Sequence, residues 1–275
     1  MVPFTKMHGL GNDFVVLDLR GGAAAPDADA ARAIADRRRG IGCDQVVLIE
    51  TSDKAGVDMR LRFLNPDGSE SAACGNGARC VAARLMQEAG RDRLAIETLG
   101  GRLEATAAGD GLYTVDMGPA HLDWRDIPLA HEADTLRLDI ALGPLEGPTA
   151  VGMGNPHCVF FVDDAEDIEL AALGPQLEHH PLFPERSNVE VATVVDEGRI
   201  RVRVWERGTG ITLACGSGAC ATLVAAHRRG LTGRKAELMM DGGSLTVEWR
   251  DDGHVLLTGP VAVSFTGALD GYLAA

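Results

Sequence analysis

The sequence is poor in aromatic residues and in positive charge, and it has no long apolar run. Phe, Trp and Tyr make up 4% of the 275 residues, and the formal net charge is −14. Nucleic acids and anionic membranes are bound through basic faces, so this charge argues against both as partners. The N-terminal residues also lack the apolar core of a secretory signal. We therefore expect a soluble cytoplasmic protein that binds neither nucleic acid nor membrane.

The six cysteines include no C-x-x-C pair, which leaves little support for a zinc ribbon or a thioredoxin-like site. His179 and His180 are adjacent in the chain without a nearby third ligand, so we expect a solvated loop there and no metal. A chain of this length in a reducing compartment does not need disulfides. Small buried apolar residues are expected at four cysteines: Cys43, Cys80, Cys158 and Cys220.

The other two cysteines lie in a repeated loop. ACGNGA at residues 73–78 returns as ACGSGA at residues 214–219, and polar residues precede both copies in the same order. The intervals between these polar residues and the loop cysteine are 33, 20 and 9 residues in the first half, and 33, 18 and 9 in the second. Matched spacing of this kind indicates an internal duplication. We call these residues the marks of each half: Asn12, Gln45, Asn65 and Cys74 in one, and Asn155, Asn188, Glu206 and Cys215 in the other.

The secondary-structure pattern agrees with a duplication. A helical stretch follows each cysteine loop and runs to a glycine, Gly90 or Gly230, of the kind that ends helices. Residues 219–226 are apolar almost all round, which is typical of a buried helix. We predict two similar α/β (α+β) halves, each with strands around a buried helix, joined near residues 117–119. Short strands are indicated at FVVLDL, QVVLIE, DMRLRFL and LAIETL in the first half, and at CVFFVD, VEVATVV, IRVRVWE, LTVEW and HVLLTG in the second.

A thiol at the start of a helix has a distinct chemistry. The unpaired N–H groups and the positive end of the helix dipole favour anions there. We therefore predict that the pKa values of Cys74 and Cys215 are lowered, so that a thiolate is accessible near neutral pH. The N–H groups of four residues could hold a substrate carboxylate: Gly75, Asn76, Gly216 and Ser217.

Two such thiols facing one cleft could invert a carbon centre. A thiolate on one face would remove an α-proton, while a thiol on the other face returned one. The weak acidity of such a proton requires donors aimed at the carboxylate in a water-excluded site. His157 and Glu206 are candidates to bias which sulfur is ionised.

The remaining polar residues near the two loops predict the kind of substrate. Arg207 can pair with a second carboxylate through its planar guanidinium, and Glu206 can accept hydrogen bonds from an ammonium group. Any single Asn in this set could be an ordinary turn residue, but the matched spacing favours a binding role. The substrate would be a zwitterionic amino acid with a second polar end, surrounded by the amides of Asn12, Gln45, Asn65, Asn155 and Asn188.

The chain resembles the diaminopimelate epimerase family in six motifs, which occur in order from residue 7 to about residue 221: MHGLGNDF, GIGCDQV, FLNPDGSESAACGNGARC, MGNPHCVFFV, RSNVEV and WERGTGITLACGSGACA. The resemblance implies interconversion of LL- and meso-diaminopimelate without pyridoxal phosphate or metal, on the route to lysine and peptidoglycan. It implies Cys74 and Cys215 as the acid/base pair, and His157 and Glu206 as residues that tune the thiols. It also implies substrate contacts at Asn12, Gln45, Asn65, Gly75, Asn76, Asn155, Asn188, Glu206, Arg207, Gly216 and Ser217.

The resemblance further implies two pseudo-symmetric domains, each a barrel-like mixed sheet around a central helix. The expected domains are residues 1–118 with a C-terminal return at 262–275, carrying Cys74, and residues 119–261, carrying Cys215. Family members are usually homodimers. Ile211 departs from the glutamate usual in the family and leaves one polar contact in doubt, whereas Ser217 in place of threonine keeps its hydroxyl.

Three other functions remain open at this stage. A proline racemase or hydroxyproline epimerase of the same fold would need a more apolar pocket than the predicted amides and Arg207 provide. A thiol redox switch would explain the paired cysteines but not the paired amides. A phosphate- or nucleotide-binding module has little support, because neither loop has the G-K-[ST] ending or the G-x-G-x-x-G spacing.

Overall fold

The computed structural model describes residues 1–72 and 74–270. Ala73, which opens the first cysteine loop, and residues 271–275 of the expected C-terminal return lie outside the described residues. The chain forms two compact units, Met1–Val115 with Gly259–Ala275, and Asp116–Thr258. It passes from one unit to the other within β8 (Leu112–Pro119) and β18 (His254–Pro260). In the described part of the chain, no helix has the length and apolar character needed to cross a membrane.

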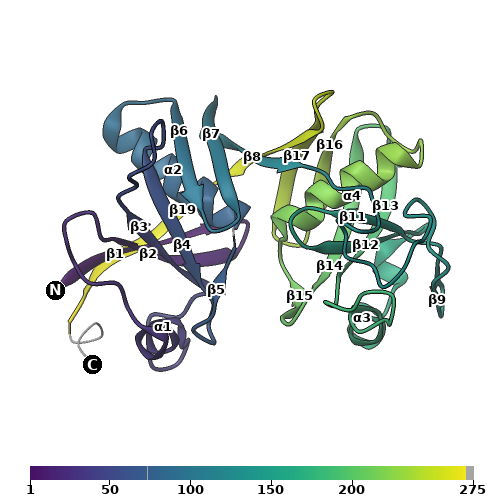
Figure 1. Ribbon diagram of the computed structural model, residues 1–275, viewed down its shortest axis with the longest axis horizontal. Coiled ribbons are helices and arrows are strands. Elements are labelled where there is room, and N and C mark those ends of the chain that lie inside the picture. The colour runs from purple at the N-terminus through teal and green to yellow at the C-terminus, as the bar shows by residue number, and fades with distance from the viewer. Residues whose placement is uncertain (73, 271–275) are drawn as a thin grey trace. The chain divides into compact units, whose positions relative to one another are not determined.

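The first unit is a mixed sheet that curves around one helix (Figure 1). Helix α2 (Gly75–Ala89) contacts β1, β2, β6 and β7, which lie toward both ends of the strand order. Helix α1 (Ala28–Ala35) packs on the other face, and β5 (Glu70–Ser71) extends β4. The pairs β2–β3 and β4–β6 are parallel and the others antiparallel. The order is β19 (Ala262–Leu269), β1 (Val2–Gly9), β2 (Asn12–Asp18), β3 (Gln45–Glu50), β4 (Met59–Leu64), β6 (Arg93–Thr98), β7 (Gly101–Gly109) and β8.

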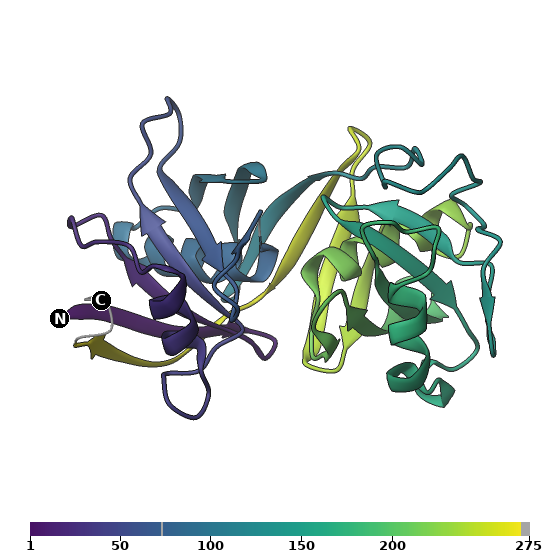
Figure 2. The ribbon, with the colours of Figure 1, turned by 60° about the horizontal axis from the view of Figure 1, so that its bottom comes forward.

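The second unit repeats this topology around α4 (Gly216–Arg228) (Figures 1 and 2). Strands β12 and β13 pair in parallel, as β2 and β3 do, and so do β14 and β16, whereas the other pairs are antiparallel. The matching order confirms the predicted duplication and the mixed sheet around a central helix. The order is β11 (Thr149–Gly152), β12 (Pro156–Phe161), β13 (Asn188–Asp196), β14 (Arg199–Glu206), β16 (Lys235–Met240), β17 (Gly243–Trp249) and β18, and β15 (Gly210–Thr212) pairs with β14.

Four short elements lie outside this repeat of strands: α3 (Leu170–Glu178), η1 (Ala165–Asp167), β9 (Ala141–Leu142) and β10 (Leu145–Glu146). Helix α3 contacts β13, β14 and β15, and the 3-10 turn η1 contacts β13 and β14. The two-residue strands β9 and β10 pair only with each other among the described residues. Together with α1, these elements cover the outer faces of the two sheets, away from the central helices.

Strands β2 and β3 of the first unit, and β12 and β13 of the second, are buried on both faces, so their side chains divide between two layers. In β3, Val46 and Leu48 pack with α1, and alternation along a strand turns Val47 to the opposite face. In β13, Val189 and Val191 pack with the α3 side, and Glu190 turns to the opposite face. Glu190 is thus a charged residue at an inward position of a buried strand.

The two central helices are buried and capped at both ends. From Ala219 to Ala226 every residue of α4 is buried, as the apolar pattern predicts. Helix α2 ends at Ala89, where Gly90 adopts a left-handed conformation at φ 62°. Helix α4 ends at Arg228, two residues before Gly230, which has φ 71°. The prediction of small buried residues is confirmed for Cys43, Cys80, Cys158 and Cys220.

The topology brings the marks of each half to one end of their own sheet. Strands β2 and β3 run in parallel and begin at Asn12 and Gln45, while β4 runs the other way and ends just before Asn65. The central helix starts directly after Cys74. The same arrangement holds in the second unit at the starts of β12 and β13, the end of β14 and the start of α4.

Close packing of α3 gives a test of the second unit. A Cβ atom added at Gly174 would lie 2.5 to 2.7 Å from three ring atoms of Trp205, and an indole ring cannot yield as a flexible side chain does. We expect Gly174→Ala to lower the free energy of unfolding by about 1–3 kcal/mol, despite the better helix propensity of alanine. Urea denaturation measures this change. Gly233→Ala is the control, because a Cβ there meets no atom within 4 Å, and equal stability of the two variants would contradict the packing argument.

Candidate active site

Both repeated cysteines are the N-cap residues of their helices, as predicted. Cys74 has φ −145° and ψ 110°, and its sulfur accepts a hydrogen bond from the Gly77 N–H at 3.4 Å. Cys215 has φ −121° and ψ 113°, and its sulfur accepts from the Gly218 N–H at 3.4 Å. The two N–H groups that precede each of these glycines belong to the first helical turn, where backbone N–H groups have no acceptor within the helix. They are the predicted anion-binding groups of Gly75 and Asn76, and of Gly216 and Ser217.

The predicted amides of the first unit are joined by hydrogen bonds. The Asn76 amide donates to Asn12 Oδ1 at 3.2 Å, and the Asn12 amide donates to Asp44 Oδ2 at 2.8 Å. Separately, the Gln45 amide donates to Asn65 Oδ1 at 2.8 Å. The structure therefore brings together Asn12 with the cysteine loop, and Gln45 with Asn65, and it fixes the orientation of each amide.

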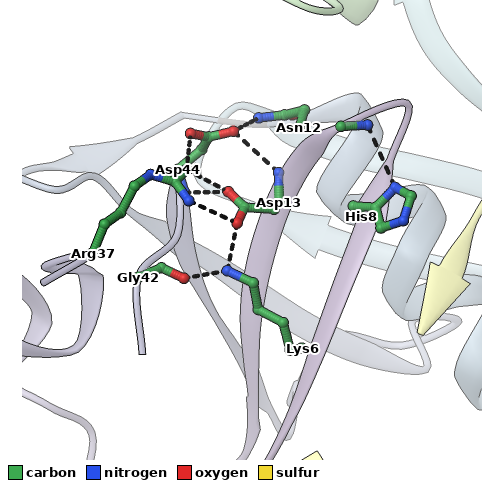
Figure 3. A network of polar contacts seen from close by, with 8 residues as sticks. Lys6, His8, Asn12, Asp13, Arg37, Gly42 and Asp44 are labelled. Carbon is green, nitrogen blue, oxygen red and sulfur yellow. Dashed lines mark hydrogen bonds and ion pairs between the residues drawn. The ribbon is translucent and has the colours of Figure 1, made fainter. Parts of the chain in front are cut away.

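A charged network that the sequence analysis did not name supports Asn12 (Figure 3). Arg37 donates to both oxygens of Asp13 and to Asp44, at 2.7 to 3.0 Å. Lys6 is buried, with its ammonium 2.5 Å from Asp13 and hydrogen-bonded to the Gly42 carbonyl. Asp44 also accepts from the Asp13 N–H at 3.0 Å. Two cations and two carboxylates thus hold the start of β2, where Asn12 lies.

The network is strongly electrostatic at Asp13. Burial of this carboxyl raises its pKa, but hydrogen bonds from Arg37 and Lys6, with their charges, outweigh burial and lower the pKa to about 2. The Asp13 side chain is 16% exposed, so solvent screens these interactions only in part. The carboxylate therefore stabilises the folded state.

In the second unit, His157 occupies a buried polar chain. Its Nδ1 lies 2.7 Å from Glu190 Oε1, and its Nε2 lies 2.9 Å from Asn155 Oδ1. His157 and Glu190 are both inaccessible to solvent. Glu190 Oε2 has no hydrogen-bond partner among the described residues. A buried carboxylate oxygen without a partner is costly, and such groups are retained chiefly where function needs them.

The turn after β14 carries the other predicted contacts of this unit. Asn188 accepts from the Arg207 N–H at 3.0 Å, and the Arg207 guanidinium donates to the Glu185 carbonyl at 2.9 Å. Glu206 accepts a hydrogen bond from the Thr212 hydroxyl. The buried carboxylate of Glu178 accepts from Trp205 Nε1 at 2.7 Å and from the Gly208 N–H at 2.9 Å. Glu178 thus fixes both ends of the segment that presents Glu206 and Arg207.

The prediction of a lowered thiol pKa is wrong for Cys215. Burial raises the pKa of this thiol well above its ordinary value, and the charges of Glu206 and Glu190 raise it further. Hydrogen bonds from Ser217 and Gly218 oppose these effects and do not overcome them. Glu206, one of the two residues predicted to tune the thiols, thus contributes to the raised pKa of Cys215. The group that adds to it is Glu190, whose carboxylate His157 contacts directly.

Two features of the sequence could have revealed the missed residues. Asp13 and Asp44 each stand beside a predicted amide, in GNDF and GCDQ. Glu190 stands in the strand VEVATVV at the position that corresponds to Val47 in the first half. A charged residue at an inward position of a buried strand is the signal for a functional group. Glu178 has no such signal, because it lies at the end of a helix.

Proteins of known family resemble this chain along nearly its whole length. The family model for diaminopimelate epimerase matches residues 4–122 and 149–264. The chain belongs to the diaminopimelate epimerase family. A diaminopimelate epimerase of Rhodospirillum centenum is 61% identical over 266 residues, which cover 97% of this chain and 91% of the relative. One of Acidiphilium cryptum is 59% identical, with 98% of this chain and 96% of the relative covered.

Solved structures share the fold at lower identity. A hydroxyproline epimerase from Agrobacterium vitis, with trans-4-hydroxy-L-proline bound, has a TM-score of 0.69 at 18% identity, covering 97% of this chain and 91% of its own. A probable proline racemase from Agrobacterium radiobacter has a TM-score of 0.70 at 16% identity, covering 98% and 93%. These similarities establish the two-unit α/β fold and leave the choice of substrate to the site.

The charged network at Asp13 predicts a pH-dependent stability. A carboxylate with a depressed folded-state pKa contributes stability that is complete above pH about 4 and is lost as the pH falls through the folded-state pKa. We expect Asp13→Asn to lower the free energy of unfolding by about 2 kcal/mol at pH 7, and to flatten its decline between pH 4 and the folded-state pKa of about 2.

Denaturant unfolding at several pH values measures this effect. Asp18→Asn is the matched control, because the partly exposed Asp18–Arg20 pair should be worth less than about 1 kcal/mol. If Asp13→Asn were no more destabilising than Asp18→Asn at pH 7, the network would not have the strength that its geometry indicates.

Proposed function

We propose that the protein interconverts LL- and meso-diaminopimelate, using Cys74 and Cys215 as the two bases. It is an isomerase of the diaminopimelate epimerase family, with close relatives of that name along nearly its whole length. The observation that carries the mechanism is the pair of cysteines that cap the buried central helices of two duplicated units. We include a cytoplasmic homodimer in the proposal on the family resemblance.

The chemistry follows from a thiol and a thiolate that share one proton. The thiolate removes the α-proton from one face of the substrate, and the thiol delivers its proton to the opposite face of the same carbon. The configuration inverts, the second sulfur becomes the thiolate, and no atom is gained or lost. Because the pair shares a proton, the pKa values observed in a titration belong to the pair.

The helix N-termini assist this step by stabilising negative charge. Removal of the α-proton pushes electron density onto the substrate carboxylate, so N–H donors aimed at that carboxylate lower the barrier. Helix starts supply such donors with a favourable dipole. In this role we place the N–H groups of Gly75, Asn76, Gly216 and Ser217.

Recognition of the rest of the substrate is assigned to the polar side chains of both units. Their fixed orientation supports this role, since hydrogen-bonded amides lose little further freedom on binding. Arg207 would pair with the distal carboxylate and Glu206 with an ammonium group. His157 and Glu206 would tune the thiols, and the remaining contacts are Asn12, Gln45, Asn65, Asn155 and Asn188.

Proton NMR in deuterium oxide tests the function directly. Purified, reduced protein with LL-diaminopimelate and no added cofactor should exchange the α-proton for deuterium while the meso isomer appears. Exchange of proline or hydroxyproline instead would keep the two-thiol mechanism and move the substrate to that of the structural relatives. Exchange of none of these would favour the redox interpretation of the cysteines.

Replacement of either sulfur tests the two-base mechanism. We expect Cys74→Ser and Cys215→Ser each to reduce epimerisation by at least about 10²-fold, because a hydroxyl is a much weaker acid than a thiol and inversion needs both faces. Conversion of LL- to meso-diaminopimelate measures this loss. Cys80→Ala is the matched control, since Cys80 is buried in the same helix as Cys74 and has no catalytic role. Near-normal turnover in either serine variant would exclude the mechanism.

Arg207 provides a separate test of substrate recognition. We expect Arg207→Met to raise KM by about 10-fold or more, because a distal carboxylate would lose its charge-assisted hydrogen bonds. Arg207→Lys should raise KM less, as it keeps the charge without the planar fork. Initial rates over a range of substrate concentrations separate the two variants, and an unchanged KM in Arg207→Met would refute the assignment.

A further inference from the structure

The duplication allows the surroundings of the two sulfurs to be compared position by position. In the first unit β2 and β3 pair in parallel with Phe14 opposite Gln45, and in the second β12 and β13 pair with His157 opposite Asn188. The same registers place Val47 opposite Val16, and Glu190 opposite Val159. Phe14 and Val47 of the first unit therefore correspond to His157 and Glu190 of the second.

One residue of each pair, Phe14 in the first unit and Glu190 in the second, lies behind the first turn of the central helix. A Cβ added at Gly77 would lie 3.3 Å from a ring atom of Phe14. A Cβ added at the corresponding Gly218 would lie 2.7 Å from Glu190 Oε1 and 3.3 Å from the sulfur of Cys215. The helix start is therefore backed by a phenyl ring in one unit and by a carboxylate in the other.

The central helices also differ in whether they bury a charged side chain. Helix α2 buries Arg79 completely, and its Nε donates to the Pro260 carbonyl at 3.4 Å. The corresponding residue of α4 is the uncharged Cys220. The unit that carries Cys74 thus buries a cation in its central helix, whereas the unit that carries Cys215 buries an anion beneath the helix start.

We propose that Glu190, oriented by His157, is a positioning residue that makes the two thiols inequivalent, because its buried charge favours the protonated form of Cys215 and the corresponding residue of the first unit is the uncharged Val47. The inference rests on the proposed function for its meaning in catalysis. Its contacts support it, since His157 holds one carboxylate oxygen at 2.7 Å and the other has no partner among the described residues. The negative field of Glu190 is therefore only partly neutralised.

Other charged and polar groups near the Cys215 sulfur also affect its pKa. The carboxylate of Glu206, at the end of β14, also raises the pKa of Cys215, and the Ser217 hydroxyl and Gly218 N–H lower it. Arg228 and Arg229 lie at the opposite end of α4. Glu190 differs from Glu206 in its burial, because it is solvent-inaccessible and so its field is little screened.

The test is a titration of each thiol without substrate. Protein labelled with ¹³C at cysteine Cβ reports ionisation of Cys74 and Cys215 by NMR, with the two signals assigned from the serine variants. We expect Glu190→Gln, which keeps the shape and the acceptor for His157, to move the titration midpoint of Cys215 down by about one pH unit or more. The titration midpoint of Cys74 should move less than that of Cys215, because a shift at Cys74 would arise only through its coupling to Cys215.

Glu190→Asp separates a charge effect from a packing effect. It keeps the carboxylate, so its Cys215 midpoint should stay closer to that of the wild type than the midpoint of Glu190→Gln does. Glu248→Gln, at a partly exposed surface pair, is the control and should move neither midpoint. An unchanged Cys215 midpoint in folded Glu190→Gln, or equal shifts in Glu190→Gln and Glu190→Asp, would overturn the inference.

The titration also separates this inference from the proposed function. A protein that fails to epimerise diaminopimelate but shows the Glu190-dependent midpoint would refute the function and keep the inequivalence of the thiols. A protein that epimerises diaminopimelate without any Glu190-dependent shift would support the proposed function and refute the role of Glu190.

Discussion

The burial of the two central helices is the constraint on which the rest of the structure depends. A helix surrounded by its sheet can expose little more than its ends, so its N-terminal N–H groups become the natural place for an anion. Because the strands that flank the helix begin or end at the same edge, their terminal side chains gather around those N–H groups. In the first unit Asn12 meets the first turn of α2 for this reason, where it accepts a hydrogen bond from the Asn76 amide.

The same burial acts on each sulfur in two opposing ways. It strengthens the attraction between a thiolate and the helix N-terminus, an effect worth about 0.3–2 kcal/mol. It also removes water from the thiolate, which for a fully buried group can shift a pKa by about 3–5 units. For Cys215 desolvation is the larger effect, and two carboxylates add to it. Helix position alone therefore predicts the wrong direction for the pKa shift of Cys215, because the depth of burial and the position of Glu190 cannot be read from a loop motif.

The sequence predicted what repeats locally and missed what depends on distant pairing. The spacing of the paired marks was sufficient to predict the duplication and the two helix starts. Strands such as β1 and β19 pair across nearly the whole chain, with Val2 opposite Leu269, and no local pattern encodes that contact. The Asp13 network was missed for a related reason, since Lys6 and Arg37 meet it from separate segments. Glu190 was visible in principle, as a charge in the strand whose counterpart carries Val47.

Duplication followed by divergence explains why two similar half-sites need not behave alike. A two-base epimerase must visit both protonation states of its thiol pair, because each direction of reaction starts from the state in which the other ends. A buried charge behind one sulfur cannot alter the equilibrium between substrate and product, which the enzyme does not set. It can alter which protonation state the resting enzyme occupies, and hence how often the enzyme must exchange its proton before the less favoured direction begins. Phe14 and Val47 stand where the second unit has His157 and Glu190, and Glu190 places a charge beside Cys215, so this difference lies in the scaffold and precedes any substrate.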